Sequence, residues 1–300
     1  MENKIATPSE TKKILREHNL NLKKSLGQNF LVDSNIINII TAAADIKGDE
    51  FLIEIGPGIG SLTQSVLEKL ESGKLLAVEK DAAMVEVLAD LFAGEERLTL
   101  LHQDALKINW EEIAAEYNPK SRKTKLIANL PYYVTTPIIM GVLESKIELE
   151  RMVFMVQKEV GERICAGPET KKFGSLSVAV QYYMQPEIVH QVPSSVFIPQ
   201  PDVDSVIVCL SPYEENRYQK NVISEDFFFQ IVKSIFQQRR KTLRNSLSKS
   251  AVINLDRDLV TQALKDEGIG IKKRGEKLSI FEMISISNRI YNMINKAEEN

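Results

Sequence analysis

The sequence predicts an α/β sheet domain followed by a smaller, all-helical C-terminal domain. Short apolar runs rich in β-branched residues alternate with helical patterns through the first two-thirds of the 300 residues. This alternation is typical of a parallel sheet with helices on both faces. It stops at Ser211, Pro212 and Tyr213, after which only helical patterns follow. A chain of this length also holds about two domains of roughly 150 residues, so we place the boundary between residues 211 and 212.

The individual elements follow from the hydrophobic period in chain order. Apolar runs bounded by turn residues predict strands at 51–55, 75–78, 98–101, 126–128, 152–156, 188–192 and 206–210. Helical periodicity predicts helices between them at 61–70, 82–92 and 136–143, and past the boundary at about 225–237, 240–249, 256–267 and 278–296. We therefore expect a sheet domain with an N-terminal extension at 1–211 and a helical domain at 212–300.

Composition excludes several classes of protein. The chain is 43% hydrophobic and 26% charged, which are ordinary values for a globular protein. Its two cysteines, Cys165 and Cys209, are far apart and its three histidines are scattered, so we expect neither a disulfide scaffold nor a metal site. No apolar run approaches the roughly 18 residues of a membrane span, and acids at Glu2 and Glu10 argue against a signal peptide. We expect a cytoplasmic protein that does not bind membranes.

Positive charge is distributed unevenly along a chain whose net charge is −3. Residues 227–250 contain six basic residues and no acid, and residues 11–30 contain five basic residues against one acid. A third basic cluster occupies residues 272–277. Each cluster alone is more often a solvated face than a binding site. Three of them on an otherwise acidic chain favour a polyanionic partner such as a nucleic acid.

The sharpest local motif follows the first predicted strand, where glycines occupy alternate positions 56, 58 and 60. Glycines there let the chain turn sharply and let a ligand approach the main-chain N–H groups. The dinucleotide fingerprint GxGxxG would require glycine at position 61, which is Ser61 in this chain. The GxGxG arrangement is instead the one used by Rossmann-like class I methyltransferases that depend on S-adenosylmethionine.

Two acids stand at the ends of the next two strands. Glu79 closes the second strand, 23 residues after Gly56, where a carboxylate would accept both hydroxyls of a ribose. Asp104 follows the third strand, where a carboxylate could accept from an adenine amine. Either acid alone could be an ordinary surface residue. Together with the glycine loop they predict a cofactor site at the carboxyl edge of the sheet, where open α/β sheets bind ligands.

The tetrapeptide Asn129, Leu130, Pro131 and Tyr132 follows the fourth strand. Such a motif marks methyltransferases that act on an amino group conjugated to a ring, because the nitrogen lone pair is delocalised and weakly nucleophilic. The Asn129 side-chain oxygen and the Leu130 carbonyl can accept both N–H bonds of the amine, while Tyr132 offers a ring for stacking. Positioning and electrostatics would then supply most of the catalysis. The same residues could also form no more than a plain Asn-x-Pro turn.

With these motifs the chain resembles the ribosomal RNA adenine N6-dimethyltransferases, and within them the bacterial small-subunit (16S) rRNA dimethyladenosine transferases. The resemblance covers about residues 12–290. It includes KSLGQNFL at 24–31, the glycine loop, Glu79, Asp104 and NLPY at 129–132. It also includes FIPQPDVDS at 197–205, FQQRRKTLRN at 236–245 and RGEKLS at 274–279.

The resemblance implies a role for each matching residue. It implies that the cofactor is S-adenosylmethionine and that seven residues bind it: Asn29, Leu31, Gly56, Gly58, Glu79, Asp104 and Asn129. The implied catalytic residues are Asn129, Leu130, Tyr132 and Phe197, with Phe197 stacking on the flipped adenine opposite Tyr132. The implied RNA-binding residues are Lys23, Lys24, Arg239, Arg240, Lys241 and Arg244. No metal is implied.

The family dimethylates two adjacent adenosines in a hairpin loop near the 3′ end of small-subunit rRNA, and some members act in ribosome assembly. The resemblance therefore implies rRNA in the 30S particle as partner, and we expect a monomer when the protein is free. Erythromycin-resistance methyltransferases, which modify large-subunit rRNA, share the catalytic motifs. Two further functions stay open: a factor that binds pre-30S particles and whose methyl transfer is incidental, and a NAD-dependent dehydrogenase. Ser61 and the absence of a placed hydride-transfer acid argue against the dehydrogenase.

Overall fold

The computed structural model describes residues 4–20, 29–130, 134–145, 147–215 and 217–298, and it divides the chain into two compact units. Unit 1 comprises Met1–Gly161 and Pro186–Pro212, and unit 2 comprises Glu162–Gln185 and Tyr213–Asn300. The second crossing from unit 1 to unit 2, between Pro212 and Tyr213, lies one residue from the predicted domain boundary. The segment Glu162–Gln185, which is predicted to belong to the sheet domain, packs instead with the C-terminal helices.

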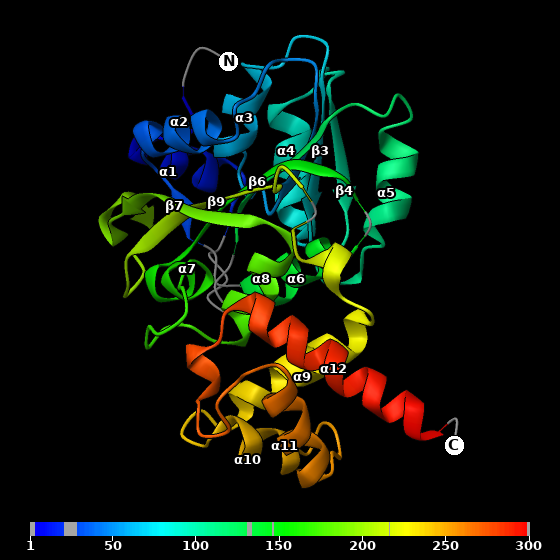
Figure 1. The fold of residues 1–300 in the computed structure, drawn as a ribbon. Coiled ribbons are helices and arrows are strands. Elements are labelled where there is room, and N and C mark those ends of the chain that lie inside the picture. Colours follow the sequence, from blue (N-terminus) through cyan, green and yellow to red (C-terminus); the bar gives the residue numbers. More distant parts are fainter. Residues whose placement is uncertain (1–3, 21–28, 131–133, 146, 216, 299–300) are drawn as a thin grey trace. The chain divides into compact units, whose positions relative to one another are not determined.

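Unit 1 is built on a seven-stranded sheet with the strand order β4-β3-β2-β5-β6-β9-β7 (Figure 1). The strands are β2 (Phe51–Ile55), β3 (Lys74–Glu79), β4 (Leu98–His102), β5 (Thr124–Asn129), β6 (Leu149–Gln157), β7 (Gln185–Val192) and β9 (Ser205–Ser211). Each overlaps a predicted strand. The pairs from β4 across to β6 are parallel, but β9 runs antiparallel to β6. The prediction of a parallel sheet was wrong at β9. This strand lies beside β7 in the sheet and follows it along the chain without the helical crossover that parallel neighbours require.

The register of the three central strands brings their carboxyl ends to one line. Ile55 of β2 lies opposite Val78 of β3 on one side and Ala128 of β5 on the other. The residue after each of these positions therefore lies at the same edge of the sheet. Those residues are Gly56, Glu79 and Asn129, each of which the sequence predicts as a site residue on separate grounds.

Helices cover both faces of this sheet. They are α1 (Pro8–Glu17), α2 (Ser34–Ala43), α3 (Ser61–Leu67), α4 (Ala82–Leu91), α5 (Trp110–Tyr117), α6 (Thr135–Glu144) and α7 (Lys158–Ile164). Buried side chains of α1 to α4 form one core with strand residues such as Leu52 and Val153. Figure 1 shows α5 on the opposite side of the sheet from α1 and α2. Asp33, Asp81 and Asn109 cap α2, α4 and α5 by accepting main-chain N–H bonds in the first turn.

A second, two-stranded sheet is not predicted from the sequence. In it β1 (Phe30–Leu31) pairs antiparallel with β8 (Phe197–Ile198), so that Leu31 lies opposite Phe197. The main-chain N–H of Val32 extends the pairing by donating to the carbonyl of Val196 at 2.9 Å. Strands of two residues give no periodic signal. Their pairing brings two predicted site segments, 29–31 and 197, side by side.

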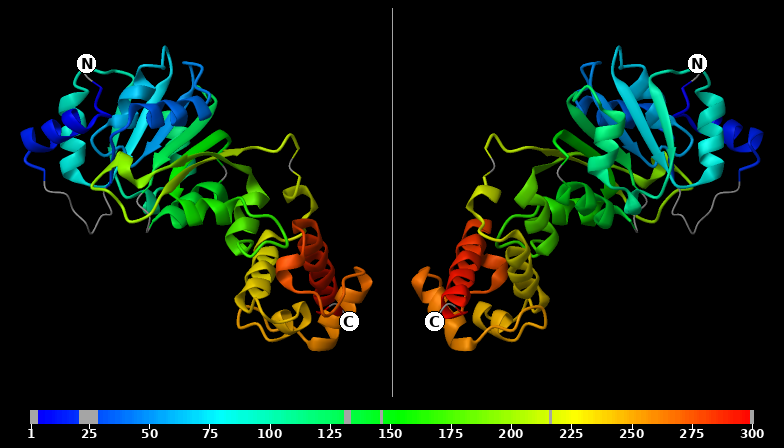
Figure 2. Two further views of the ribbon diagram at one scale, coloured as in Figure 1. Left: turned by 90° about the vertical axis from the view of Figure 1, so that its left-hand side faces the viewer. Right: turned by 90° about the vertical axis from the view of Figure 1, so that its right-hand side faces the viewer.

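Unit 2 is helical in the residues that the structure describes (Figure 2). Its helices are α8 (Ser175–Tyr183), α9 (Glu225–Gln237), α10 (Leu243–Ser248), α11 (Arg257–Asp266) and α12 (Ile280–Glu298), and their buried faces form a separate core. The predicted helix 240–249 is shorter than expected, because residues 238–242 form a turn before α10. Arg240 and Arg244 therefore do not share a helix face. No described helix of the chain has the length and apolar character needed to cross a membrane.

Gly275 lies close against the side chain of Ile235 in the core of unit 2, and substitution of this glycine tests the packing. Gly275 opens the 3₁₀ turn Gly275–Lys277, and a Cβ placed there would overlap Cγ2 of Ile235, a side chain that is 1% exposed. Gly275→Ala should therefore lower the free energy of unfolding by about 1–3 kcal/mol through overpacking, as measured by urea denaturation. The matched control is Gly270→Ala, since no described atom beyond Gly270 and its two chain neighbours lies within 4 Å of a Cβ at that position. Equal losses in the two variants would contradict the packing described here.

Candidate active site

The loop after β2 is a tight left-handed turn. Gly56, Gly58 and Gly60 have φ angles of 69°, 58° and 87°, a region that side-chain-bearing residues rarely adopt. A Cβ at Gly58 would stand 3.1 Å from Cε1 of Phe30, so the ring of Phe30 in β1 packs directly on the loop. The glycines therefore serve both the turn and the close approach of the N-terminal strand.

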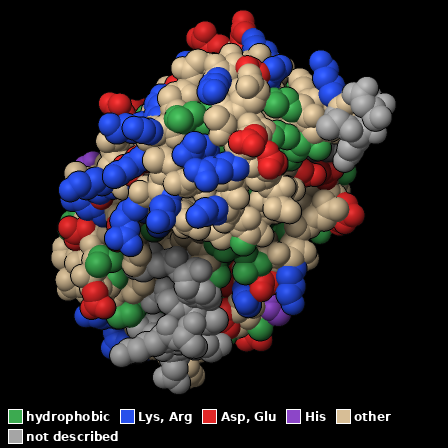
Figure 3. Space-filling model, turned by 60° about the horizontal axis from the view of Figure 1, so that its bottom comes forward, with side chains coloured by type: hydrophobic (Ala, Val, Ile, Leu, Met, Phe, Trp, Pro, Cys, Tyr) green, Lys and Arg blue, Asp and Glu red, His purple; other side chains and the backbone are tan. Residues whose placement is uncertain are grey.

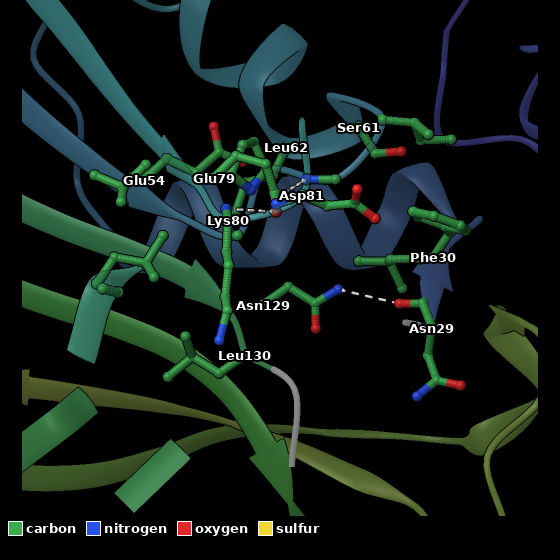
Figure 4. A pocket seen from close by; sticks show the side chains of 18 of the residues that line it. Asn29, Phe30, Glu54, Ser61, Leu62, Glu79, Lys80, Asp81, Asn129 and Leu130 are labelled. Atoms are coloured by element: carbon green, nitrogen blue, oxygen red, sulfur yellow. Dashed lines mark hydrogen bonds between the residues drawn. The ribbon is translucent and has the colours of Figure 1, made fainter. Parts of the chain in front are cut away.

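Glu79 closes this loop from the end of β3. Its carboxylate accepts main-chain N–H bonds from Gly58 (3.2 Å), Lys80 (2.8 Å) and Asp81 (2.8 Å), as Figure 4 shows. The side chain is 9% exposed, and burial raises the pKa of Glu79 although the three hydrogen bonds oppose this shift. The carboxylate is thus held in one orientation at the carboxyl edge of the sheet.

Asp104 stands beside Lys80 just after β4. The ammonium of Lys80 lies 2.8 Å from Oδ2 of Asp104, and the N–H of Leu106 donates to Oδ1 at 3.1 Å. The ion pair with Lys80 lowers the pKa of Asp104, which keeps this carboxyl ionised as an acceptor. In Figure 4 the Lys80 side chain extends from the end of β3 toward Leu130. Sequence reasoning missed Lys80, because a lysine after a strand has no distinctive pattern.

Asn129 ends β5 and faces the N-terminal strand. Its amide nitrogen donates to the carbonyl of Asn29 at 3.5 Å (Figure 4). Since the donor end of the amide is directed at Asn29, its acceptor oxygen is available to another group. Leu130 is buried beside it at 2% exposure. The predicted partner Tyr132 lies outside the described residues.

The described residues that are predicted to bind the cofactor or to act in catalysis all line one pocket. Its lining includes Asn29, Leu31, Gly56, Gly58, Glu79, Asp104, Asn129, Leu130 and Phe197. The structure therefore brings together in unit 1 every residue of those two groups that it describes. Of the predicted RNA-binding residues, Arg239, Arg240, Lys241 and Arg244 belong to unit 2, and Lys23 and Lys24 lie outside the described residues.

The pocket has features of a site for a polar ligand. Ser61 lines it, and the Ser61 hydroxyl is buried with no hydrogen-bond partner among the described residues. A buried polar atom without a partner costs free energy unless a ligand or water satisfies it. Apolar walls from Ile55, Leu62 and Val78 lie beside the carboxylates of Glu79 and Asp104. This combination of donors, acceptors and apolar surface fits a polar ligand that also has apolar parts.

A buried carboxyl lies beneath the glycine loop. Oε2 of Glu54 accepts from the hydroxyl of Thr63 at 2.7 Å, and the residue is 1% exposed. Burial raises the pKa of Glu54 to about 8, and the negative charge of Glu79 adds to the shift. Sequence reasoning did not select Glu54, since one acid inside an apolar strand gives no sign of which face it occupies.

The comparisons with known proteins agree with this geometry. A family model described as ribosomal RNA adenine dimethylase matches residues 19–292. This chain belongs to that family. It is 49% identical over 298 residues to Ribosomal RNA small subunit methyltransferase A of Halothermothrix orenii, covering 99% of this chain and 98% of that protein. It is 44% identical to the protein of the same name from Alkaliphilus metalliredigens, covering 96% and 98%.

Two solved structures share the fold. A dimethyladenosine transferase from Plasmodium falciparum superposes with a TM-score of 0.73 at 24% identity, covering 90% of this chain and 98% of the other. The 23S rRNA methyltransferase ErmE gives a TM-score of 0.64 at 21% identity, covering 87% and 99%. At these identities the likeness shows the fold alone. It confirms the predicted Rossmann-like class I methyltransferase fold.

The raised pKa of Glu54 predicts a pH dependence of stability. An acid whose folded pKa lies above its unfolded value stabilises the fold fully below the unfolded pKa, and this contribution is lost as pH rises through the folded pKa. Between pH 4.5 and about 8, Glu54 should therefore lower the free energy of unfolding by up to about 1.4 kcal/mol per pH unit.

Glu54→Gln keeps the acceptor for Thr63 but cannot ionise, so its stability should fall less over this range. Urea denaturation of both proteins at pH 5, 6, 7 and 8 measures the difference. Parallel curves for the two proteins would show that Glu54 is ionised in the native state throughout.

Proposed function

We propose that this protein transfers methyl groups from S-adenosylmethionine to N6 of two adjacent adenosines in the 3′-terminal hairpin loop of 16S rRNA, acting on the 30S particle, with a role in ribosome biogenesis. The observation that carries the proposal is the single pocket that joins Glu79 and Asp104 to Asn129, Leu130 and Phe197. The residues that would bind the nucleoside and those that would bind the amine therefore line one cavity. Family membership supports the reaction class.

The residues at the strand ends would hold the cofactor. Glu79 would accept the ribose hydroxyls, and Asp104 would accept the adenine amine while keeping its ion pair with Lys80. Gly56, Gly58 and the unpartnered hydroxyl of Ser61 would face the methionine portion. S-adenosylmethionine supplies an electrophilic methyl group on its sulfonium. Residues at the ends of β3 and β4 would thus hold its adenosine end, while Asn129 and Leu130 at the end of β5 line the same pocket.

Asn129 and Leu130 would prepare the target amine. Their oxygens would accept its two N–H bonds, and Asn129 can do so because its own N–H₂ donates to Asn29. The nitrogen lone pair would then point at the methyl carbon. The two acceptor oxygens would stabilise the positive charge that develops on the nitrogen as it takes up the methyl group, and the surplus proton would then leave to water. Catalysis by positioning and by acceptors aimed at the developing charge is the expected mode.

Aromatic contact would fix the base. Phe197 lines the pocket on β8 and is held opposite Leu31 by the two-stranded sheet. An adenine flipped out of an RNA loop can stack on such a ring, which compensates part of the lost base stacking. Together with Tyr132 this would complete the binding of the target base.

Unit 2 would dock the RNA. Arg240 and Lys241 are exposed in the turn before α10, and no described acid forms an ion pair with either. Figure 3, turned so that the bottom of Figure 1 comes forward, shows lysine and arginine side chains gathered on one face. Such charges neutralise phosphates and release counterions, so binding should weaken as salt is raised. The protein would act as a cytoplasmic monomer without a metal.

Methylation of 30S subunits that lack the family's modification tests the function directly. With radiolabelled S-adenosylmethionine, we expect label in two adjacent adenosines of 16S rRNA, mapped by primer extension. Isolated 50S subunits are the control that separates this activity from that of the large-subunit enzymes. Label in 23S rRNA, or binding to 30S subunits without methyl transfer, would contradict the proposal.

Glu79→Gln should weaken cofactor binding while leaving the loop folded. The amide oxygen can still accept from Lys80 and Asp81, but the NH₂ group cannot accept from Gly58 or from a ribose hydroxyl. Loss of a charge-assisted hydrogen bond corresponds to about 1.5–3 kcal/mol, or roughly ten- to a hundredfold in Kd by calorimetry. Glu86→Gln, an exposed position on α4, is the matched control. Unchanged affinity in Glu79→Gln would remove Glu79 from the cofactor site.

Asn129→Ala should lower turnover rather than binding. If the Asn129 oxygen acts chiefly as the amine becomes tetrahedral, kcat should fall by about 100-fold or more while KM for both substrates holds within a few-fold. Single-turnover methylation of 30S subunits measures the chemical step. A variant with full kcat would show that Asn129 only shapes the turn.

A further inference from the structure

Hydrogen bonds in unit 2 join three segments that are far apart in the sequence: residues 167–173, 238–243 and 272–277. We call them together the basic junction. The guanidinium of Arg239 donates from Nη2 to the carbonyl oxygens of Lys171 (2.8 Å) and Phe173 (2.6 Å). The main-chain N–H of Leu243 donates to the carbonyl of Lys273 at 2.8 Å. Residues 238–243 are thereby hydrogen-bonded both to residues 167–173 and to residues 272–277.

The third link closes the junction. The main-chain N–H of Glu169 donates to the carbonyl of Glu276 at 2.8 Å, which bonds the first segment to the third. Packing supports the same arrangement, since the buried ring of Phe173 meets Phe236 edge-on at 5.7 Å. Each segment is therefore fixed by the other two.

The junction concentrates positive charge. Its three segments contain nine basic residues and two acids, Glu169 and Glu276. Glu162 and Glu282 pair with Lys172 and Lys273, and Glu276 lies 4.0 Å from Arg274. The other six basic residues have no ion pair with a described acid; they are Lys171, Arg239, Arg240, Lys241, Lys272 and Lys277. A surface with this excess of charge fits a polyphosphate backbone.

Lys171 stands out among these residues. It is exposed on the loop between α7 and α8, a loop that no basic cluster in the sequence marks. Its main-chain carbonyl is one of the two acceptors of Arg239, so the position of its side chain depends on a residue 68 positions later in the chain. Nη2 of the Arg239 guanidinium donates to both of these carbonyls. No described acid forms an ion pair with Arg239, so its positive charge is not neutralised.

We propose that Lys171 is an additional phosphate contact for the RNA substrate, and that Arg239 is a positioning residue that holds the Lys171 loop in the basic junction. This rests on the proposed function, because it assumes that unit 2 docks the RNA. The alternative is that Arg239 contacts phosphate only by its own charge and the loop carries no RNA contact. The two differ in what a lysine at position 239 can do. Lysine keeps the charge, but its ammonium nitrogen stands one bond nearer the main chain than Nη2 of arginine. Its N–H bonds also do not lie in one plane with fixed directions, so it cannot donate to both carbonyls from the place that Nη2 occupies.

The test measures binding of 30S subunits that lack the methyl groups, at several salt concentrations. Lys171→Ala should reduce the slope of log affinity against log salt by about 1 and weaken binding about five- to tenfold at 0.1 M salt. Lys265→Ala is the matched control, since Lys265 is an exposed lysine of unit 2 on α11, outside the junction. Affinity for S-adenosylmethionine should stay unchanged in both variants.

Arg239→Lys separates positioning from charge. If Arg239 positions the loop, this variant should lose affinity as Lys171→Ala does, and adding Lys171→Ala to it should cost little more. Trypsin should also cleave faster after Lys171 and Lys172, because the loop is no longer held, while the melting temperature of the whole chain stays within a few degrees. This readout reports loop order without reference to RNA.

Two results would overturn the inference. One is wild-type affinity and salt slope in Lys171→Ala. The other is near-wild-type binding by Arg239→Lys together with a full additional loss from Lys171→Ala. Failure of the proposed function has a different signature, because the wild-type protein itself would then fail to methylate 30S subunits, whatever the variants bind.

Discussion

The alignment of the carboxyl ends of β3, β2 and β5 is the constraint on which the site depends. Main-chain pairing fixes Ile55 opposite Val78 and Ala128, and this register places Gly56, Glu79 and Asn129 at one edge. A slip of one residue in either pair would turn a site side chain to the other face of the sheet. Nearly all side chains of these strands are buried, so apolar packing enforces the register that the chemistry requires.

In and beside β2, the partner of each buried carboxyl decides whether its pKa is lowered or raised. At the opposite edge Glu50 meets Lys125 at 2.7 Å; burial alone would raise the pKa of Glu50, but hydrogen bonds from Lys125, Lys47 and Gly48 lower it. Glu54, four residues along β2, has a neutral hydroxyl partner, and its pKa is raised to about 8. An ion pair thus secures one end of the sheet, while the end that would face the cofactor holds carboxyls without a buried cation among the described residues.

Much of the fold and of the pocket could be predicted from the sequence because the signals are local. Each predicted strand is present, and the glycine loop, Glu79, Asp104 and Asn129 follow strands whose order along the chain is visible. The antiparallel β9, the two-residue pairing of β1 with β8 and the place of Glu162–Gln185 in unit 2 were not predictable in that way. Each depends on contacts between distant segments, and neither hydrophobic period nor turn chemistry records such contacts.

The basic surface of unit 2 is a further feature that the sequence alone does not predict, because it also depends on contacts between distant segments. In the sequence the basic residues at 239–244 and 272–277 are two clusters separated by about thirty residues, and Lys171 belongs to neither. Three hydrogen-bonded links in the fold join all of them into one surface. Arg239 illustrates why a motif alone cannot assign roles within that surface. The sequence alone does not distinguish Arg239 from Arg240, and both side chains are exposed in the fold. Arg239 donates to two main-chain carbonyls, whereas the side chain of Arg240 has no hydrogen bond to a described residue. Arg239 can therefore order the surface, while the guanidinium of Arg240 can bind the RNA.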